Sequence, residues 1–210
     1  MEIRHGCRSS IGEFAQTDLL SAAETAVVRL FPRPLGRVLK DNADLKPKPR
    51  SYGITANMPG EDYYDYWAIS RSGDFFAIST FSEDQVAPGK LYFNIRIARA
   101  AEAIAHCASL YKALGADAHC IVELTIAYSG LSTRILSAPP GDMRWDFWDE
   151  SATKEDEVSA SVSFRLGYWE SDLTALVKQL CAPLFVLFDF KIVEDGLYDR
   201  MVSDFLNGKV

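Results

Sequence analysis

Two histidine–cysteine pairs are the residues best suited to chemistry in this 210-residue sequence. His106 is followed by Cys107, and His119 is followed by Cys120. Two imidazoles and two thiolates form a tetrahedral zinc site where they converge. The apolar periodicity around both pairs predicts that each pair splits, with the cysteine in the core and the histidine in solvent. We therefore expect buried thiols at Cys107 and Cys120, and no metal site.

Other catalytic chemistry has weaker candidates. Cys7 has His5, Arg4 and Arg8 as neighbours, which favour a thiolate, but it falls in an expected N-terminal tail. Asp189 is a single acidic residue in an apolar run, where a helix cap or a salt bridge explains it. Phosphate-binding loops, serine-hydrolase elbows, HExxH and dinucleotide fingerprints are missing from the sequence. We predict no catalytic residues and no cofactor, while an enzyme without a recognisable motif stays an alternative.

The charge of the chain is segregated. A net charge of -7 at pH 7 argues against attraction of the whole surface to nucleic acid. Residues 33–50 are nevertheless basic and rich in proline. We interpret them first as a solvated loop, and the alternative is a segment that contacts phosphates; any nucleic-acid binding through it is expected to be weak. The basic side chains of this segment are Arg33, Arg37, Lys40, Lys46, Lys48 and Arg50.

An acidic segment, residues 142–157, contains an aromatic cluster. Its members are Met143, Arg144, Trp145, Phe147 and Trp148. These residue types are enriched at protein interfaces. Two interpretations stay open: the loop folds back over the core, or it is a contact surface for a protein partner or for self-association.

The elements that must position these residues alternate between helices and strands. Apolar residues spaced by three and four predict helices over 18–31, 95–114, 172–181 and 197–206. Aromatic and β-branched runs, and alternation of apolar with polar residues, predict strands over 63–70, 75–81, 120–128, 131–137 and 158–166. The first two strands form one hairpin and the next two form another. Residues 32–62 are expected to be an irregular connector.

This order predicts a single α+β domain over residues 17–210, preceded by a tail over residues 1–16. We expect an antiparallel sheet of about five strands, covered on one face by the long helix and the C-terminal helices. No apolar run reaches the length of a membrane span, and the first residues do not form a signal peptide. We therefore expect a cytoplasmic protein with no membrane contact.

Three segments together resemble the region that follows the Schlafen/AlbA-type DNA-binding domain in certain bacterial proteins. They are residues 91–115, 121–136 and 180–190, and Glu2–Ser10 (EIRHGCRSS) is similar to the end of that preceding domain. The tail over residues 1–16 would then be a remnant of it. The resemblance implies a non-catalytic accessory or regulatory interaction domain of a prokaryotic nucleic-acid-associated or defence-type protein. It carries no catalytic residue across, because these segments contain no catalytic motif.

A sensor of small molecules is the alternative function. It would hold its ligand in a pocket between the sheet and the long helix. The aromatic side chains expected to line that pocket are Tyr64, Tyr66, Phe76 and Tyr111.

Overall fold

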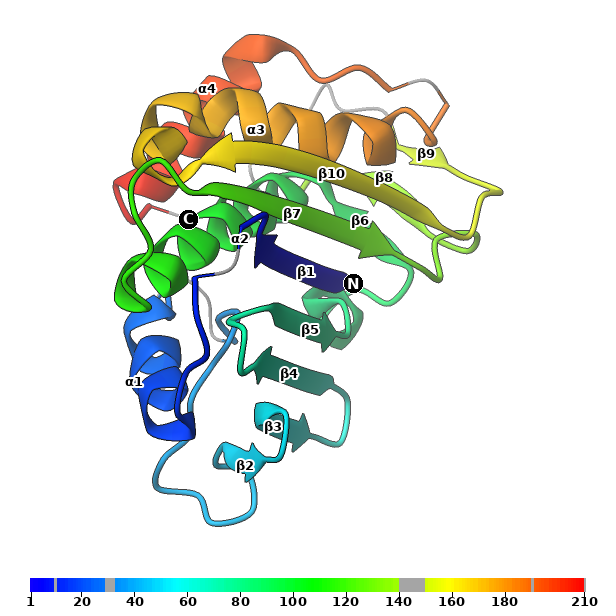
Figure 1. Cartoon of the computed structure of the whole chain (residues 1–210). Helices are drawn as coiled ribbons and strands as arrows, with labels where there is room; N and C mark the ends of the chain where they lie inside the picture. The colour runs from blue at the N-terminus through cyan, green and yellow to red at the C-terminus, as the bar shows by residue number, and fades with distance from the viewer. Residues whose placement is uncertain (10, 29–32, 140–149, 190, 210) are drawn as a thin grey trace.

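The computed structural model describes residues 1–9, 11–28, 33–139, 150–189 and 191–209. A seven-stranded sheet with the order β10-β7-β1-β5-β4-β3-β2 forms its centre (Figure 1). Every neighbouring pair in this sheet is antiparallel. The strands are β1 (Glu2–Cys7), β2 (Lys48–Arg50), β3 (Gly53–Pro59), β4 (Tyr64–Ser70), β5 (Phe75–Ser79), β7 (Ile121–Tyr128) and β10 (Val158–Arg165).

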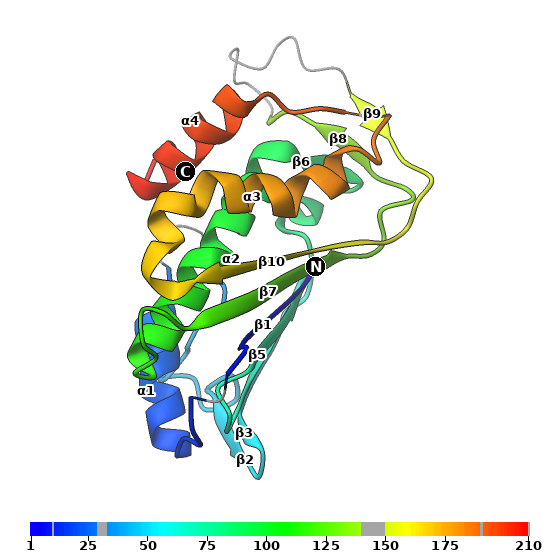
Figure 2. The same ribbon diagram turned by 45° about the horizontal axis from the view of Figure 1, so that its top comes forward.

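The α-helices of the described residues lie on one side of this sheet, which Figure 2 shows nearly edge-on. They are α1 (Gln16–Ala26), α2 (Phe93–Ala113), α3 (Trp169–Phe185) and α4 (Asp195–Leu206). Helix α2 packs on β1 and β7, α1 on β3, and α3 on β10. The predicted α+β class with a sheet covered on one face is therefore confirmed. Within the described ranges, no helix is both long and apolar enough to cross a membrane.

Alternating sequence patterns account for the strands that were predicted well. In β10, Val162 and Phe164 are buried while Ser161 and Ser163 are exposed, as expected for a strand with one dry face. The β4–β5 hairpin turns at Gly73, whose φ of 89° is readily adopted only by glycine. Helix α3 runs through Pro183 and is longer than predicted.

Residues 2–7 are a strand inside the sheet and not a tail. Strand β1 pairs with β5 on one side and with β7 on the other. Its alternate residues Ile3 and His5 are buried, whereas Arg4 between them is exposed. The six residues are too short and too polar to be recognised as a strand before their two neighbours are known. They join the two halves of the sheet.

Two further predictions about the strands were wrong. Residues 32–62 are not irregular throughout, because they contain β2 and β3. Strand β7 does not form a hairpin with residues 131–137; its partners are β1 and β10. Residues 135–137 instead form β8 in a second, three-stranded sheet with β6 and β9. These strands are β6 (Lys90–Tyr92), β8 (Ile135–Ser137) and β9 (Ser151–Ala152), and β6 runs parallel to β8.

Truncating Ile3 to alanine tests the position of β1. Ile3 is 2% exposed, and its loss leaves a cavity in the core between the sheet and α2. We expect Ile3→Ala to lower the free energy of unfolding by about 2–5 kcal/mol in urea titrations. Ser159→Ala, at an exposed position of β10, should change it by less than about 0.5 kcal/mol. Equal stability of the two variants would contradict a central β1.

Candidate functional site

The polar stripe of α2 faces the interior, contrary to the expectation that its histidine lies in solvent. Arg99, Glu102 and His106 are 8%, 1% and 0% exposed. The Glu102 carboxylate accepts hydrogen bonds from the Leu35 backbone amide at 2.9 Å and from Arg99 Nη1 at 2.6 Å. Arg99 Nη1 also donates to the Arg33 carbonyl at 3.0 Å. Residues 33–37 of the connector therefore cover this stripe and supply its partners.

A second buried ion pair joins Arg96 of α2 to Glu83. Arg96 Nη2 donates to both carboxylate oxygens of Glu83 at 2.8 and 2.7 Å, and both side chains are buried. The Arg96 guanidinium also lies 5.2 Å from the centre of the Phe81 ring. A buried pair with such close contacts is stable only because each charge has its partner. We interpret this pair as structural.

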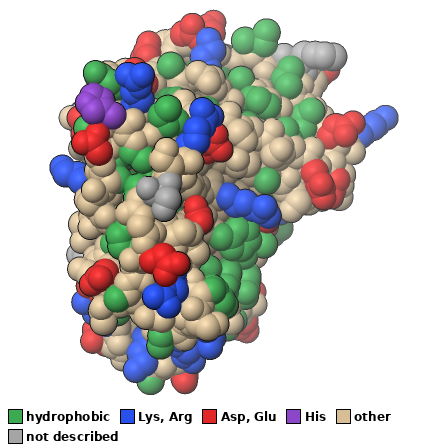
Figure 3. Space-filling view, viewed as in Figure 1, with side chains coloured by type: hydrophobic (Ala, Val, Ile, Leu, Met, Phe, Trp, Pro, Cys, Tyr) green, Lys and Arg blue, Asp and Glu red, His purple; other side chains and the backbone are tan. Residues whose placement is uncertain are grey.

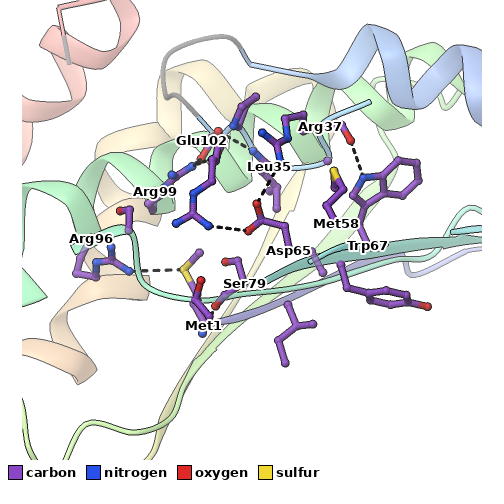
Figure 4. A pocket seen from close by; sticks show the side chains of 18 residues that line it. Met1, Leu35, Arg37, Met58, Asp65, Trp67, Ser79, Arg96, Arg99 and Glu102 are labelled. Atoms are coloured by element: carbon purple, nitrogen blue, oxygen red, sulfur yellow. Dashed lines mark hydrogen bonds and ion pairs between the residues drawn. The ribbon is translucent and has the colours of Figure 1, made fainter. Parts of the chain in front are cut away.

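A small cavity lies between residues 33–37, strands β4 and β5, and helix α2 (Figure 4). Its volume is about 40 Å³. Asp65 on β4 is shared by two arginines, with Arg33 Nη1 at 3.5 Å from Oδ1 and Arg37 Nη2 at 3.7 Å from Oδ2. Burial raises the pKa of Asp65, and the nearby arginines act in the opposite direction. Trp67 Nε1 donates to the Arg37 carbonyl at 2.8 Å and holds the connector over the cavity.

Next to this cavity, His5 and His106 form a buried cluster with Tyr111. The Tyr111 hydroxyl donates to the His5 carbonyl at 2.9 Å, so it accepts from His5 Nδ1 at 3.1 Å. His5 Nε2 is then an acceptor, and His106 Nδ1 donates to it at 3.2 Å. The remaining nitrogen, His106 Nε2, has no partner among the described residues. Gly36 lies against it, since a Cβ built there would come within 2.4 Å of Nε2.

The two histidines are neutral in the folded protein. Burial lowers the pKa of His106 from 6.5 to about 3, and it lowers the pKa of His5 well below 6.5, with a smaller contribution from His106. This cluster has no exposed face from which a substrate could receive a proton. We interpret it as a structural connection between β1, α2 and the connector.

Lowering the pH should destabilise the protein through these histidines. The unfolded chain binds protons near pH 6.5 and the folded chain does not, so stability is full above pH 6.5 and falls as the pH decreases toward 3. We expect the decrease in unfolding free energy between pH 7 and pH 5 to be smaller in His106→Gln than in the wild type, by about 1–2 kcal/mol. Urea titrations at the two pH values measure it. Parallel pH dependences would show that His106 is not held neutral.

The cysteines do not form a metal site with the histidines. Cys107 is buried as predicted, whereas Cys120 is only half-buried and lies 2.8 Å, sulfur to sulfur, from Cys7. Burial raises the pKa of Cys7, and its contact with Cys120 adds to this, so it is not an activated thiolate. His119 is exposed. The described ranges contain no group of three or more potential metal ligands.

The structure divides the basic segment into two parts. Arg33 and Arg37 point toward Asp65, with 11% and 19% of their side chains exposed. Lys40 pairs with Glu24 at 2.6 Å. The other three basic residues, Lys46, Lys48 and Arg50, are exposed. These three residues and Lys40, whose side chain is 61% exposed, can reach an external partner, whereas Arg33 and Arg37 cannot.

The predicted aromatic interface cannot be placed, because Met143, Arg144, Trp145, Phe147 and Trp148 lie outside the described residues.

The expected aromatic pocket between sheet and long helix does not form. Tyr111 packs on His5 with their ring centres 5.4 Å apart. Tyr64, Tyr66 and Phe76 alternate with the buried Trp67 and Phe75 along β4 and β5, so they point away from the helices. The alternation is present in the sequence. Which of the two alternating sets of side chains faces the helices was not predicted correctly, because the arginines that hold Asp65 on the helix side come from a distant segment.

These aromatics belong to the open face, the side of the seven-stranded sheet opposite the helices. Tyr66 lies opposite Ile78, and the Tyr66 and Phe76 ring centres are 6.1 Å apart. The Arg4 guanidinium lies 5.4 Å from the centre of the Phe76 ring. Tyr52, in the β2–β3 turn, is 54% exposed. We define the open face by its aromatic, apolar and basic members: Arg4, Lys48, Arg50, Tyr52, Tyr64, Tyr66, Phe76 and Ile78.

Charge on the open face increases toward β2. Arg4, on the central strand β1, is paired with Glu2 at 2.6 Å, so the two charges offset each other there. At the β2 edge, Lys48 and Arg50 are exposed, and Arg50 Nε donates to Thr55 at 3.2 Å. Figure 3 shows hydrophobic side chains gathered over β4 and β5 with basic side chains at their border. The open face therefore combines accessible rings with a basic edge.

No protein-family model matches the chain, and no curated protein or solved structure matches it either.

Proposed function

We propose that this chain is a non-catalytic accessory domain of a prokaryotic nucleic-acid-associated protein, and that its open face binds single-stranded nucleic acid. The observation that carries the proposal is the set of aromatic rings on a sheet face that the described helices leave uncovered, next to exposed basic residues. The resemblance of residues 91–115, 121–136 and 180–190 to the region after a Schlafen/AlbA-type domain agrees with this role.

The rings favour bases that are not already stacked. Tyr66 and Phe76 are partly exposed and held by their strands, so a planar base can lie on them at little entropic cost. Bases of a duplex are stacked on each other and present only their edges to a protein. A flat face with rings therefore suits a single strand. Stacking also tolerates any base, which predicts weak sequence preference.

The basic residues would hold the phosphates. Lys46, Lys48 and Arg50 lie at the β2 edge, and Arg4, beside the Phe76 ring, would exchange its pairing with Glu2 for a phosphate. Each phosphate contact on a single strand contributes about −0.7 to the slope of log affinity plotted against log salt concentration. With three or four such contacts, we expect a slope of about −2 to −3. Because the overall charge is -7, attraction is confined to this region.

The cavity does not favour the alternative of a sensor for metabolite-sized molecules. Ligand pockets of that kind measure roughly 300–1,000 Å³. The cavity next to Asp65 measures about 40 Å³, too small for a ligand of that size. No group of residues described above combines a nucleophile with a base, so an enzymatic function has no geometric support.

Replacing the rings tests the proposal. We expect fluorescence anisotropy to show binding of a labelled twelve-residue oligothymidine at low salt, and Tyr66→Ala and Phe76→Ala each to weaken it by about 5- to 100-fold, the range of one base stacked on an aromatic ring. Tyr168→Ala removes a tyrosine that is 54% exposed and lies outside the open face, and it should leave the affinity unchanged.

Two outcomes would contradict single-strand binding by the open face. One is equal or tighter binding of a duplex of the same length. The other is an affinity that neither Tyr66→Ala nor Phe76→Ala changes. Circular dichroism of each variant shows whether the sheet is intact. We expect it to be intact, because the substituted rings lie on the face away from the core.

A further inference from the structure

We propose that the cavity between residues 33–37, β4 and α2 binds a small oxyanion of the phosphate or sulfate type, held mainly by Arg37. This site goes beyond the proposed function, because it lies on the helix side of the sheet. Asp65 and Tyr66 are neighbours on β4 and point to opposite faces, so the two ligands would not compete for the same side chains.

Among the described residues, the charged side chains that line the cavity, counted with their ion-pair partners, leave one positive charge in excess. Arg96 is paired with Glu83, and Arg99 is paired with Glu102. The other two arginines that line the cavity, Arg33 and Arg37, share the single carboxylate of Asp65. Their distances of 3.5 and 3.7 Å are longer than a charge-assisted hydrogen bond of about 2.8 Å. An uncompensated charge in a largely buried position is unfavourable, and an anion would remove that cost.

The Arg37 guanidinium has an edge prepared for an oxyanion. Its Nε and Nη2 atoms are buried and have no hydrogen-bond partner among the described residues. These two nitrogens form one side of the planar guanidinium, and their hydrogens point in parallel toward two oxygens of one phosphate or carboxylate group. Arg33 would keep its contact with Asp65, while Arg37 exchanges its weaker contact for the ligand.

The position of Arg37 is fixed by its own backbone. Its carbonyl accepts the hydrogen bond from Trp67 Nε1 at 2.8 Å, and Trp67 is 2% exposed. The preceding Gly36 has a φ of 66° and packs against His106, so this part of the connector cannot move outward without breaking the core. A preorganised arginine loses little freedom on binding.

The size and polarity of the cavity select a small ligand. A volume of about 40 Å³ corresponds to roughly three water molecules at about 10–15 Å³ each. A single tetrahedral oxyanion, free or as the end group of a larger molecule, is of this size. Ser79, Thr80 and Ser82 also line the cavity and add neutral hydroxyl groups.

Thermal unfolding in phosphate tests the site. The melting temperature of the wild type should be higher in sodium phosphate than in sodium chloride of equal ionic strength. The phosphate concentration that gives half of this increase should be at least tenfold lower for the wild type than for Arg37→Gln. Arg165→Gln, which removes an exposed arginine of β10, should behave as the wild type. This control is needed because phosphate stabilises most proteins by being excluded from their surface. Equal responses of wild type and Arg37→Gln would overturn the proposal.

Two further measurements keep the test decisive if Arg37→Gln folds poorly. Arg37→Lys keeps the charge but loses the paired nitrogens, and it should also bind phosphate at least several-fold more weakly by isothermal titration calorimetry. Glycerol phosphate distinguishes the source of the oxyanion: binding of both compounds indicates an end group that enters from outside, and binding of inorganic phosphate alone indicates an enclosed ion. Binding of neither overturns the site. Oligothymidine affinity should be unchanged in Arg37→Gln, which separates this proposal from that of the open face.

Discussion

The buried carboxylate of Glu102 is the constraint on which much of this structure depends. A charge at 1% exposure on the middle of α2 is unfavourable unless hydrogen bonds and an opposite charge compensate it. Arg99 supplies the charge, and the Leu35 amide supplies a hydrogen bond from the connector. Because both partners must be present, the connector has to cross α2 at this level. The chain then enters β2 and β3 at the edge of the sheet.

This crossing gives β4 and β5 two different faces. On the helix side, Trp67 and Asp65 bind the connector, and Phe75 stacks on His5 with ring centres 4.6 Å apart. On the other side, Tyr66 and Phe76 have no layer to cover them within the described residues. The same strands therefore stabilise the core and present rings outward. A binding surface of this kind is rigid, because each ring is carried by a paired strand rather than by a loop.

Sequence patterns were sufficient where one element buries one continuous stripe. The hairpin of β4 and β5, the helix α2 and the strand β10 follow from apolar spacing and from glycines at the turns. They failed for His106, because periodicity separates polar from apolar residues and cannot tell which polar stripe another segment will cover. They also failed for β1, whose burial depends on β5 and β7, residues more than 60 positions away.

The same limit applies to the candidate sites. Six basic residues in one segment predicted one phosphate-binding surface, but the ion pairs of Arg33 and Arg37 with Asp65 turn two of them inward. Tyr66 and Phe76 were recognised as ligand-binding candidates and assigned to the wrong face. Both errors concern contacts between residues far apart in the sequence. Arg33 and Arg37 pair with Asp65 on the helix side of β4, and its neighbour Tyr66 therefore points to the other side. No local pattern in the sequence encodes this pairing.

The most direct test of the account is aromatic ¹³C NMR of the protein with and without oligothymidine. Ring stacking on a base shifts the signals of the stacked side chain, and neighbouring residues on β4 and β5 point to opposite faces. The account predicts that the ring signals of Tyr66 and Phe76 shift on binding, while those of Trp67 and Phe75 stay in place. Shifts confined to Trp67 and Phe75, or to residues of α3 and α4, would contradict it.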